Sequence, residues 1–151
     1  MALALLAAAA PWPVMAETVA LTGVQLIDGR GGPALENATL IVHNDRIEMA
    51  GVGIHVPRGV KTLDYRGRTI IPGLISDHSH VGLVSGIDNG AQNYTRANIL
   101  AQLKQYRRYG VTTVTALGLN GPLFETVRAE AHAGLIDGAD LFGVFHGIGT
   151  P

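Results

Sequence analysis

Residues 67–80, GRTIIPGLISDHSH, carry the pattern that decides the fold of this chain. An apolar run bends at a Pro-Gly step, enters a buried strand and ends at two histidines, His78 and His80. Side chains in a strand repeat every two positions, so both imidazoles are expected to point the same way and to reach one metal ion. A bare His-x-His pair is more often two solvated or capped histidines than a metal site, so the surrounding sequence has to decide.

The sequence that follows this stretch alternates helix and strand patterns. Apolar residues fall at helical spacing from Ile99 to Gly110, residues 111–116 form a β-branched run, a second helix begins near Pro122, and residues 141–145 form a last apolar run. Such strands separated by helices are typical of a parallel sheet buried under helices. The sequence therefore predicts an α/β fold with three parallel strands and two main helices. A closed (β/α)8 barrel of the TIM type needs about 250 residues, so we expect only the first strands and helices of an incomplete one.

The sequence before residue 71 has a shorter period. Apolar residues alternate in brief runs that indicate β-strands separated by turns. These runs are Val19–Leu21, Val24–Ile27, Thr39–Val42 and Arg46–Met49. Asn44 and Asp45 suit a tight hairpin because both tolerate a positive φ. We expect a small β-rich domain over residues 17–70, with strands too short for a large sheet, and a truncated barrel start over residues 71–151.

Charge and cysteine content limit the classes of function. A formal net charge of -1 creates no long-range field for phosphate backbones, so we expect no nucleic-acid partner. The basic residues Lys104, Arg107 and Arg108 fit a solvated helix face. The chain has no cysteine, so any metal must be held by nitrogen and oxygen ligands.

The first sixteen residues, MALALLAAAAPWPVMA, are typical of a secretory signal peptide. Val14-Met15-Ala16 has the small-residue spacing of a signal peptidase site. The apolar segment is shorter than the roughly 20 residues of a membrane span. It departs from the usual pattern because no Lys or Arg precedes Arg30, and a buried N-terminal helix is the alternative. We expect an exported protein, periplasmic or secreted, without a membrane span.

Residues 67–80, with segments 37–42 and 45–47 before them, resemble the amidohydrolase superfamily. Its members carry a small N-terminal β domain, then a Pro-Gly-Leu-Ile segment, then a metal-binding His-x-His on the first barrel strand. Residues 110–114, GVTTV, are similar to the second strand of that family. The resemblance spans residues 19–150 and is greatest to the imidazolonepropionase-like branch.

The resemblance implies that His78 and His80 are ligands of a divalent metal, zinc first, with iron or manganese as alternatives and one or two ions. The family's other ligands, a carboxylated lysine or glutamate, further histidines and an aspartate, lie on later strands that this chain does not contain. Many members have Asp where this chain has Ser76, and Asp77 is expected to point away from the metal. The implied reaction is hydrolysis of a carbon–nitrogen bond by metal-activated water, in an amide, a cyclic amide or a dipeptide.

The remaining histidines differ in position. His146 follows the third predicted strand, and barrel active sites collect residues at such strand ends, so we expect a substrate contact there rather than a metal ligand. An exposed loop histidine is the alternative. His43, His55 and His132 are expected at the surface.

Two functions stay open. One is a metal-dependent hydrolase of which this chain is an N-terminal fragment. The other is a non-catalytic or degenerate binding module that lacks the rest of the metal site. The sequence does not determine the oligomeric state.

Overall fold

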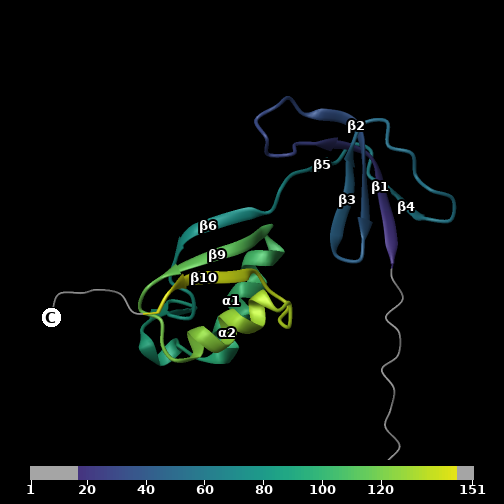
Figure 1. Ribbon diagram of the computed structural model, residues 1–151. Coiled ribbons are helices and arrows are strands. Elements are labelled where there is room, and N and C mark those ends of the chain that lie inside the picture. The colour runs from purple at the N-terminus through teal and green to yellow at the C-terminus, as the bar shows by residue number, and fades with distance from the viewer. Residues whose placement is uncertain (1–16, 146–151) are drawn as a thin grey trace, which may run out of the picture. The chain divides into compact units, whose positions relative to one another are not determined.

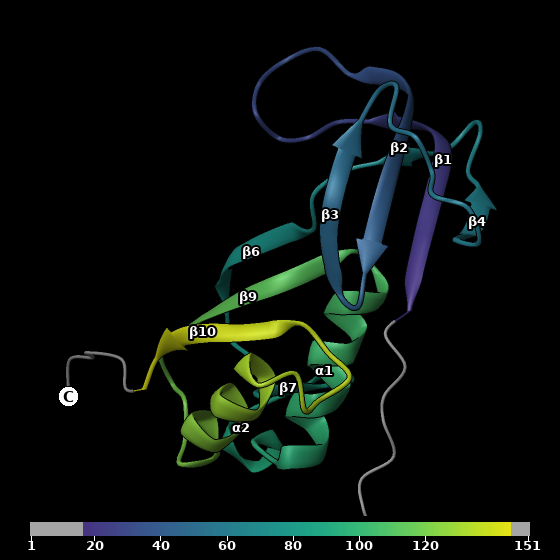
Figure 2. The same cartoon turned by 45° about the vertical axis from the view of Figure 1, so that its right-hand side comes forward.

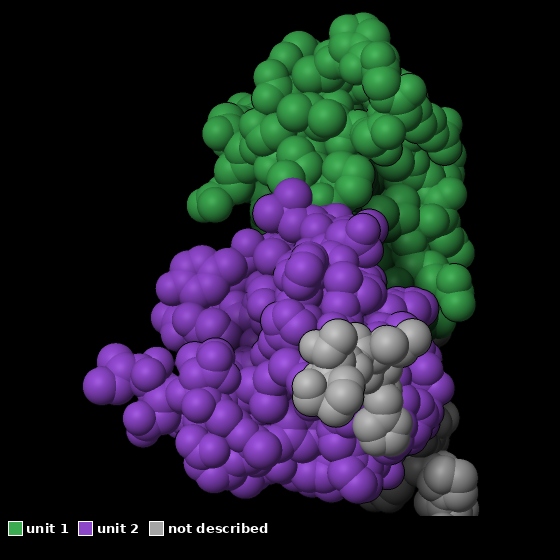
Figure 3. All heavy atoms as spheres, turned by 90° about the vertical axis from the view of Figure 1, so that its left-hand side faces the viewer, with its two compact units in different colours: residues 1–72 green, residues 73–151 purple. Residues whose placement is uncertain are grey.

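The computed structural model describes residues 17–145, which form two compact units that divide after Pro72. Figure 3 shows the two units in separate colours. The described part of the first unit is built of β-strands, whereas the second combines strands with two α-helices (Figures 1 and 2). The α/β class expected from the sequence is confirmed.

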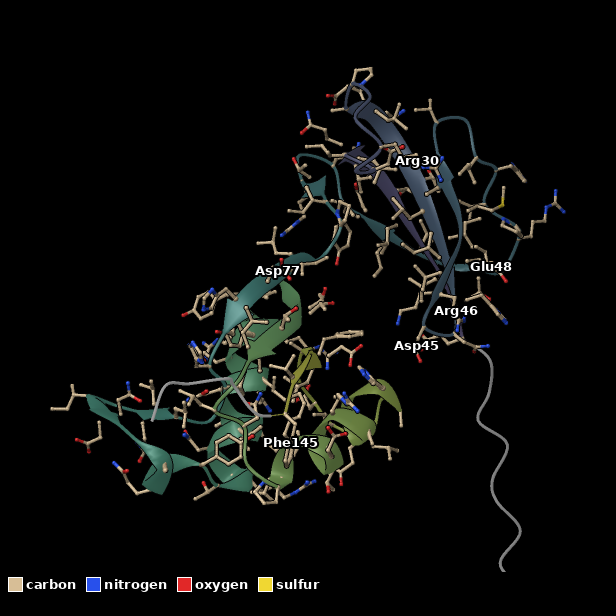
Figure 4. All side chains as sticks on the ribbon, turned by 60° about the vertical axis from the view of Figure 1, so that its left-hand side comes forward. Arg30, Asp45, Arg46, Glu48, Asp77 and Phe145 are labelled. Carbon is tan, nitrogen blue, oxygen red and sulfur yellow. The ribbon has the colours of Figure 1, made fainter. Side chains whose placement is uncertain are left out.

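The first unit holds a five-stranded sheet. Its strands are β1 (Thr18–Leu26), β2 (Leu35–His43), β3 (Arg46–Gly51), β4 (Lys61–Asp64) and β5 (Thr69–Ile70). The order is β3-β2-β1-β4, and β5 pairs with the end of β1. Strand β2 pairs antiparallel with both β1 and β3, while β4 and β5 run parallel to β1. The predicted hairpin is confirmed, because Asn44 lies between β2 and β3 with a φ of 44°. Figure 4 labels Asp45 and Arg46 at this turn and Glu48 farther along β3.

Strand β1 is continuous where the sequence predicts two short strands. The strand runs through Gly23, and its register against β2 shifts between Thr22 and Val24. Gly23 has a φ of 75°, a left-handed conformation that lets a strand absorb an extra residue as a bulge. The expectation of short strands was therefore wrong, since β1 and β2 have nine residues each.

The core of the first unit lies between β1 and β2. Val24 pairs with Ala38 across the two strands, and both side chains are fully buried. Leu26 and Leu40 complete the cluster, against which Tyr65 packs. The apolar alternation that predicts strands here is thus the alternation that fills this core.

The second unit contains a three-stranded parallel sheet. Its strands are β6 (Leu74–Ser79), β9 (Val111–Leu117) and β10 (Asp140–Val144), in the order β10-β9-β6. The helices α1 (Arg96–Arg108) and α2 (Leu123–His132) connect them. Figures 1 and 2 show both helices on the same side of this sheet. The predicted parallel pairing, with each crossover made by a helix, is confirmed.

The ends of both helices follow the local chemistry of the sequence. Thr95 caps α1, and its side chain accepts a hydrogen bond of 3.2 Å from the backbone N–H of Asn98. Gly110 follows α1 with a φ of 81°, as the left-handed position after a helix requires. Pro122 directly precedes α2, and Gly134 follows it with a φ of 69°.

The helices cover only one face of the parallel sheet. Val114 and Leu141 face the helices and pack against Leu103 of α1 and Phe124 of α2, and all four are nearly inaccessible to solvent. Neighbouring strand residues project from the other face. There Ile75, Phe142 and Val144 are 67%, 45% and 49% exposed.

A short irregular segment connects β6 to α1. It contains the two-stranded hairpin of β7 (Val84–Ser85) and β8 (Asp88–Asn89), followed by the 3-10 helix η1 (Ala91–Asn93). The sequence pattern did not indicate these elements, because each has only two or three residues. Within residues 17–145, no helix is long and apolar enough to cross a membrane.

Candidate metal centre

The two predicted metal ligands lie together at the carboxyl end of β6. His78 is the penultimate residue of the strand, and His80 is the first residue after the strand ends. Their ring centroids are 5.4 Å apart and the ring planes are inclined by 68°. Both residues are exposed, and neither ring has a hydrogen bond within the described part of the chain. Their nitrogens are therefore available to an external ligand.

A bulge in β6 determines how these histidines are presented. Ser76 pairs with Val114 of β9, but Ser79 pairs with Ala116, so three steps along β6 match two steps along β9. Bulges of this kind re-aim side chains and are common beside active sites. Ser79 is only 5% exposed, whereas the histidines on both sides of it are exposed.

A chain of hydroxyl groups lies behind the bulge. The Oγ atoms of Ser76 and Ser79 are 2.8 Å apart, and the Ser79 Oγ is 3.1 Å from the hydroxyl oxygen of Tyr106. Tyr106 belongs to α1, so these hydrogen bonds join the strand that carries the histidines to the helix behind it. Sequence reasoning missed this connection.

The segment after His80 is fastened to α1 by two amide side chains. The Gln102 carbonyl oxygen accepts a hydrogen bond of 2.7 Å from the backbone N–H of Gly82, and its amide nitrogen donates to the carbonyl of Val84 at 2.5 Å. The Asn98 side chain donates to the carbonyls of Gly82 and Val84 at 3.0 and 2.9 Å. The chain on the C-terminal side of His80 is therefore held by the same helix as Ser79.

A hollow of about 500 Å³ opens beside His80. Its walls come from α1 and from the ends of the neighbouring strands. They are His80, Val84, Gln102, Gln105, Tyr106, Tyr109 and Val111. This hollow gives solvent access to one side of the His80 ring.

The spacing of the two rings fits shared coordination of one ion. An imidazole nitrogen binds zinc at about 2.0–2.1 Å, which places the ring centroid about 3.2 Å from the ion, and two such rings at a tetrahedral angle are about 5 Å apart. The observed 5.4 Å agrees with this distance. Two neutral nitrogen donors suit zinc, iron or manganese. Within residues 17–145 no group of three or more His, Cys, Asp or Glu side chains could hold a metal ion, so an ion at this pair would need further ligands.

The other residues singled out in the sequence do not join His78 and His80 in the described part of the chain. Asp77, labelled in Figure 4, lies within the β6 bulge and is exposed, and it forms no such group with the histidines. His43 is half-buried, with its Nδ1 2.7 Å from the Thr18 hydroxyl, and His55 is exposed. His146 and the proposed signal segment 1–16 lie outside the described residues.

His132 has partners that the sequence pattern did not indicate. Its Nδ1 lies 2.5 Å from Asp140 Oδ1, and its ring centroid is 4.6 Å from that of Phe142. The residue is exposed, as expected, but it connects the end of α2 to the start of β10. It lies on different strands and helices from His78 and His80 and does not join them.

A second polar site lies at the carboxyl end of β9. Tyr94 directs its hydroxyl group toward the Asn120 side-chain oxygen, at 3.5 Å. Burial raises the pKa of Tyr94, and a hydrogen bond from the backbone of Gly121 partly offsets this change. Leu119 beside them has a φ of 57°, a left-handed conformation unusual for a residue with a branched side chain.

Comparisons with known proteins relate this arrangement to a class of enzyme. No protein-family profile matches the chain. The N-acyl-D-aspartate deacylase of Alcaligenes xylosoxydans xylosoxydans is 41% identical to it over 68 residues, which are 45% of this chain and 13% of the deacylase. Phenylurea hydrolase B is 30% identical with a TM-score of 0.68, over 85% of this chain and 31% of the hydrolase. A candidate prolidase from Bifidobacterium longum is 28% identical with a TM-score of 0.74, over 89% of this chain and 32% of that protein.

These similar proteins define a class of hydrolytic enzymes that act on amide and other carbon–nitrogen bonds. The structural neighbours are enzymes of the amidohydrolase superfamily, so the resemblance inferred from residues 67–80 is confirmed. The chain spans 31% and 32% of the length of the two solved structures and 13% of the deacylase.

Proposed function

We propose that this chain supplies the N-terminal part of a metal-dependent hydrolase that cleaves carbon–nitrogen bonds in small amides. The observation that carries the proposal is the pairing of His78 and His80, with ring centroids 5.4 Å apart, at the carboxyl end of a parallel strand. Active sites of parallel β/α folds lie at this end of the strands. The kinship with carbon–nitrogen hydrolases supports the same reaction class.

In this proposal His78 and His80 bind one divalent ion through neutral imidazole nitrogens. Zinc is the first choice, with iron or manganese as alternatives, and a second ion would need ligands from elsewhere. A bound divalent metal supplies Lewis-acid polarisation of the substrate carbonyl and acidification of water. The chain's own part is to hold the two rings at one spacing and to keep them accessible to solvent, which the exposed position beside the hollow provides.

The proposal extends to the architecture. Residues 17–70 would form the small composite β domain and residues 71–151 the first strands and helices of an incomplete (β/α)8 barrel. The parallel order β10-β9-β6 with helical crossovers supports this, since a barrel begins in the same way. Residues 1–16 would act as an export signal, with the protein periplasmic or secreted.

The substrate class follows from the resemblance to the imidazolonepropionase-like branch. We propose an N-acylated amino acid, a dipeptide or a cyclic amide. The deacylase and the candidate prolidase carry names that fit the first two choices. His146, which lies outside the described residues, remains a proposed substrate contact.

A non-catalytic binding module is the second candidate. One observation favours it: in the described part of the chain no third ligand joins the two histidines. Two imidazoles leave most coordination positions to water, and such a pair holds a metal weakly. A module of this kind would bind metal weakly and hydrolyse nothing.

The deciding experiment uses the protein encoded by the complete reading frame. The purified protein and its His78→Ala, His80→Ala variant are compared by elemental analysis and by hydrolysis of N-acyl amino acids and dipeptides. We expect the variant to lose bound metal and hydrolysis together, and a chelator to remove the activity of the parent. His55→Ala is the matched control, because His55 is exposed and lies in the first unit. Unchanged metal content in the double variant would exclude the assignment, and metal binding without hydrolysis of any tested amide would favour the binding module.

A further inference from the structure

We propose that Ser79 and Tyr106 are positioning residues that set the geometry of His78 and His80. The hydroxyl chain from Ser76 through Ser79 to Tyr106 would fix the bulge in β6, and the bulge would fix the two imidazoles. This inference rests on the proposed function, because it assigns a role toward the metal that the histidines would bind.

The first step concerns the bulge. In a regular strand, residues three positions apart point to opposite faces. Ser76 and Ser79 nevertheless lie within 2.8 Å of each other through their Oγ atoms. This contact is possible because the extra residue between them shifts the register against β9. The serine pair therefore exists only while the bulge exists.

The second step concerns burial. Ser79 is 5% exposed, so water does not readily replace a lost partner of its hydroxyl group. The Oγ has two partners at hydrogen-bond distance, one in its own strand and one on α1. A hydroxyl group has one proton to donate and two lone pairs to accept, so Ser79 can satisfy both contacts at once. Rotation of the Ser79 backbone would break both.

The third step connects Ser79 to the histidines. His78 and His80 are its immediate neighbours, so the peptide groups on both sides of Ser79 determine where their side chains begin. A one-residue slip of a strand moves its side chains to the opposite face. Tyr106 opposes that slip, because its hydroxyl contact holds Ser79 against a helix rather than against the strand alone.

The final step separates the Tyr106 hydroxyl group from the Tyr106 ring. The ring packs against the apolar core of the second unit, and this contact remains in a phenylalanine. Tyr106→Phe therefore removes the hydrogen bond and keeps the packing. Tyr109 offers a matched control, because it also lies beside the hollow at the end of α1 but is 69% exposed and its hydroxyl group has no hydrogen bond in the described chain.

The test measures metal affinity and coordination in the protein from the complete reading frame. Zinc affinity is obtained by competition with a chromophoric chelator, and the visible spectrum of the cobalt-substituted protein reports the ligand geometry. Loss of a group that orients metal ligands typically lowers affinity 10- to 100-fold, and we expect a decrease of about tenfold or more with an altered cobalt spectrum in Tyr106→Phe. Tyr109→Phe should stay within about twofold of the parent.

Ser79→Ala and Ser79→Thr provide a second comparison. The alanine variant should weaken zinc binding as Tyr106→Phe does, while threonine keeps a hydroxyl group and should recover part of the affinity. Circular dichroism confirms that each variant is folded. Parent-like affinity and cobalt spectrum in both Tyr106→Phe and Ser79→Ala would overturn the positioning role and leave the proposed function intact.

A metal-free measurement separates the two proposals. In protein labelled with nitrogen-15 at histidine, the imidazole resonances of His78 and His80 should shift in Tyr106→Phe and not in Tyr109→Phe. If the parent binds no metal through these histidines, the proposed function fails, and the positioning inference fails with it. If the parent does bind metal through these histidines but their resonances do not shift in Tyr106→Phe, the positioning inference alone is overturned.

Discussion

The side-chain amide of Asn120 donates a hydrogen bond of 2.5 Å to the backbone carbonyl of Val144. Asn120 follows β9 and Val144 ends β10, so one side chain joins the carboxyl ends of two neighbouring parallel strands. The same nitrogen also donates to the carbonyl of Ala116 at 3.3 Å. Only 4% of Asn120 is exposed, so its amide group is shielded from water.

Removing this amide should weaken the second unit. We expect Asn120→Ala to lower the free energy of unfolding by about 1–3 kcal/mol, because two backbone carbonyl groups lose a buried donor. Urea denaturation followed by helical circular dichroism measures this change, since the described α-helices lie in the second unit. Asn89→Ala at an exposed position of β8 is the control. A change below about 0.5 kcal/mol at Asn120 would show that the carbonyls find other partners.

Replacing Gly73 by a residue with a side chain should destabilise the second unit, because the Thr112 side chain occupies the space that a Cβ atom would need. A Cβ atom at Gly73 would lie 2.1 Å from the Thr112 Oγ1 and 2.6 Å from its Cγ2. Gly73→Ala should therefore displace the start of β6 from β9 and lower the free energy of unfolding by about 1–3 kcal/mol. The same urea measurement applies.

A double-mutant cycle identifies the cause of that loss. Thr112 is exposed, so Thr112→Ala alone should change stability little. In the presence of Thr112→Ala, the cost of Gly73→Ala should fall, because two of the three clashing atoms are gone. Additive effects would attribute the loss to the backbone conformation of Gly73 instead.

Replacing Lys104 by a neutral residue should raise the pKa of Asp137. The Lys104 ammonium group, 2.8 Å from the carboxylate, lowers the pKa of Asp137 below its ordinary value of 3.8, and Arg107 adds to the effect. A lowered pKa in the folded state contributes stability above the unfolded pKa, and this contribution is lost as the pH falls through the folded pKa. The contribution is small, because Asp137 is 64% exposed.

Carbon-13 titration of the Asp137 carboxyl group tests this directly. Lys104→Gln should raise the pKa of Asp137 toward 3.8. Arg108→Gln is the control, because the ion pairs of Asp137 involve Lys104 and Arg107 in the described chain. An unchanged pKa in Lys104→Gln would show that Arg107 alone acidifies the carboxylate.

The parallel sheet and its helices could be predicted from the sequence because the apolar residues of each element follow a regular pattern. The β-branched run of residues 111–116 contributes Val114 and Ala116 to the buried cluster that the helical residues Ile99 and Leu103 also join. The first unit was predicted less well. Gly23 resembles a break between strands in the sequence, but it forms a bulge whose space is limited by Arg66, far along the chain.

The candidate metal centre was predictable only in part. The spacing of His78 and His80 by two positions is local, so a strand pattern is enough to bring their rings together. Ser79 and Tyr106 are 27 positions apart, and neither belongs to a pattern that would connect them. Their contact depends on the bulge and on the angle of α1, which no periodicity encodes.

One face of the parallel sheet carries exposed apolar side chains. Ile75, Phe142 and Val144 present apolar surface that helices do not cover. A formal net charge of -1 gives little electrostatic repulsion between molecules. Contact between two such faces would then remove apolar area from water with little opposing charge. Covering these three side chains, or adding charge beside them, should therefore raise the solubility of the chain.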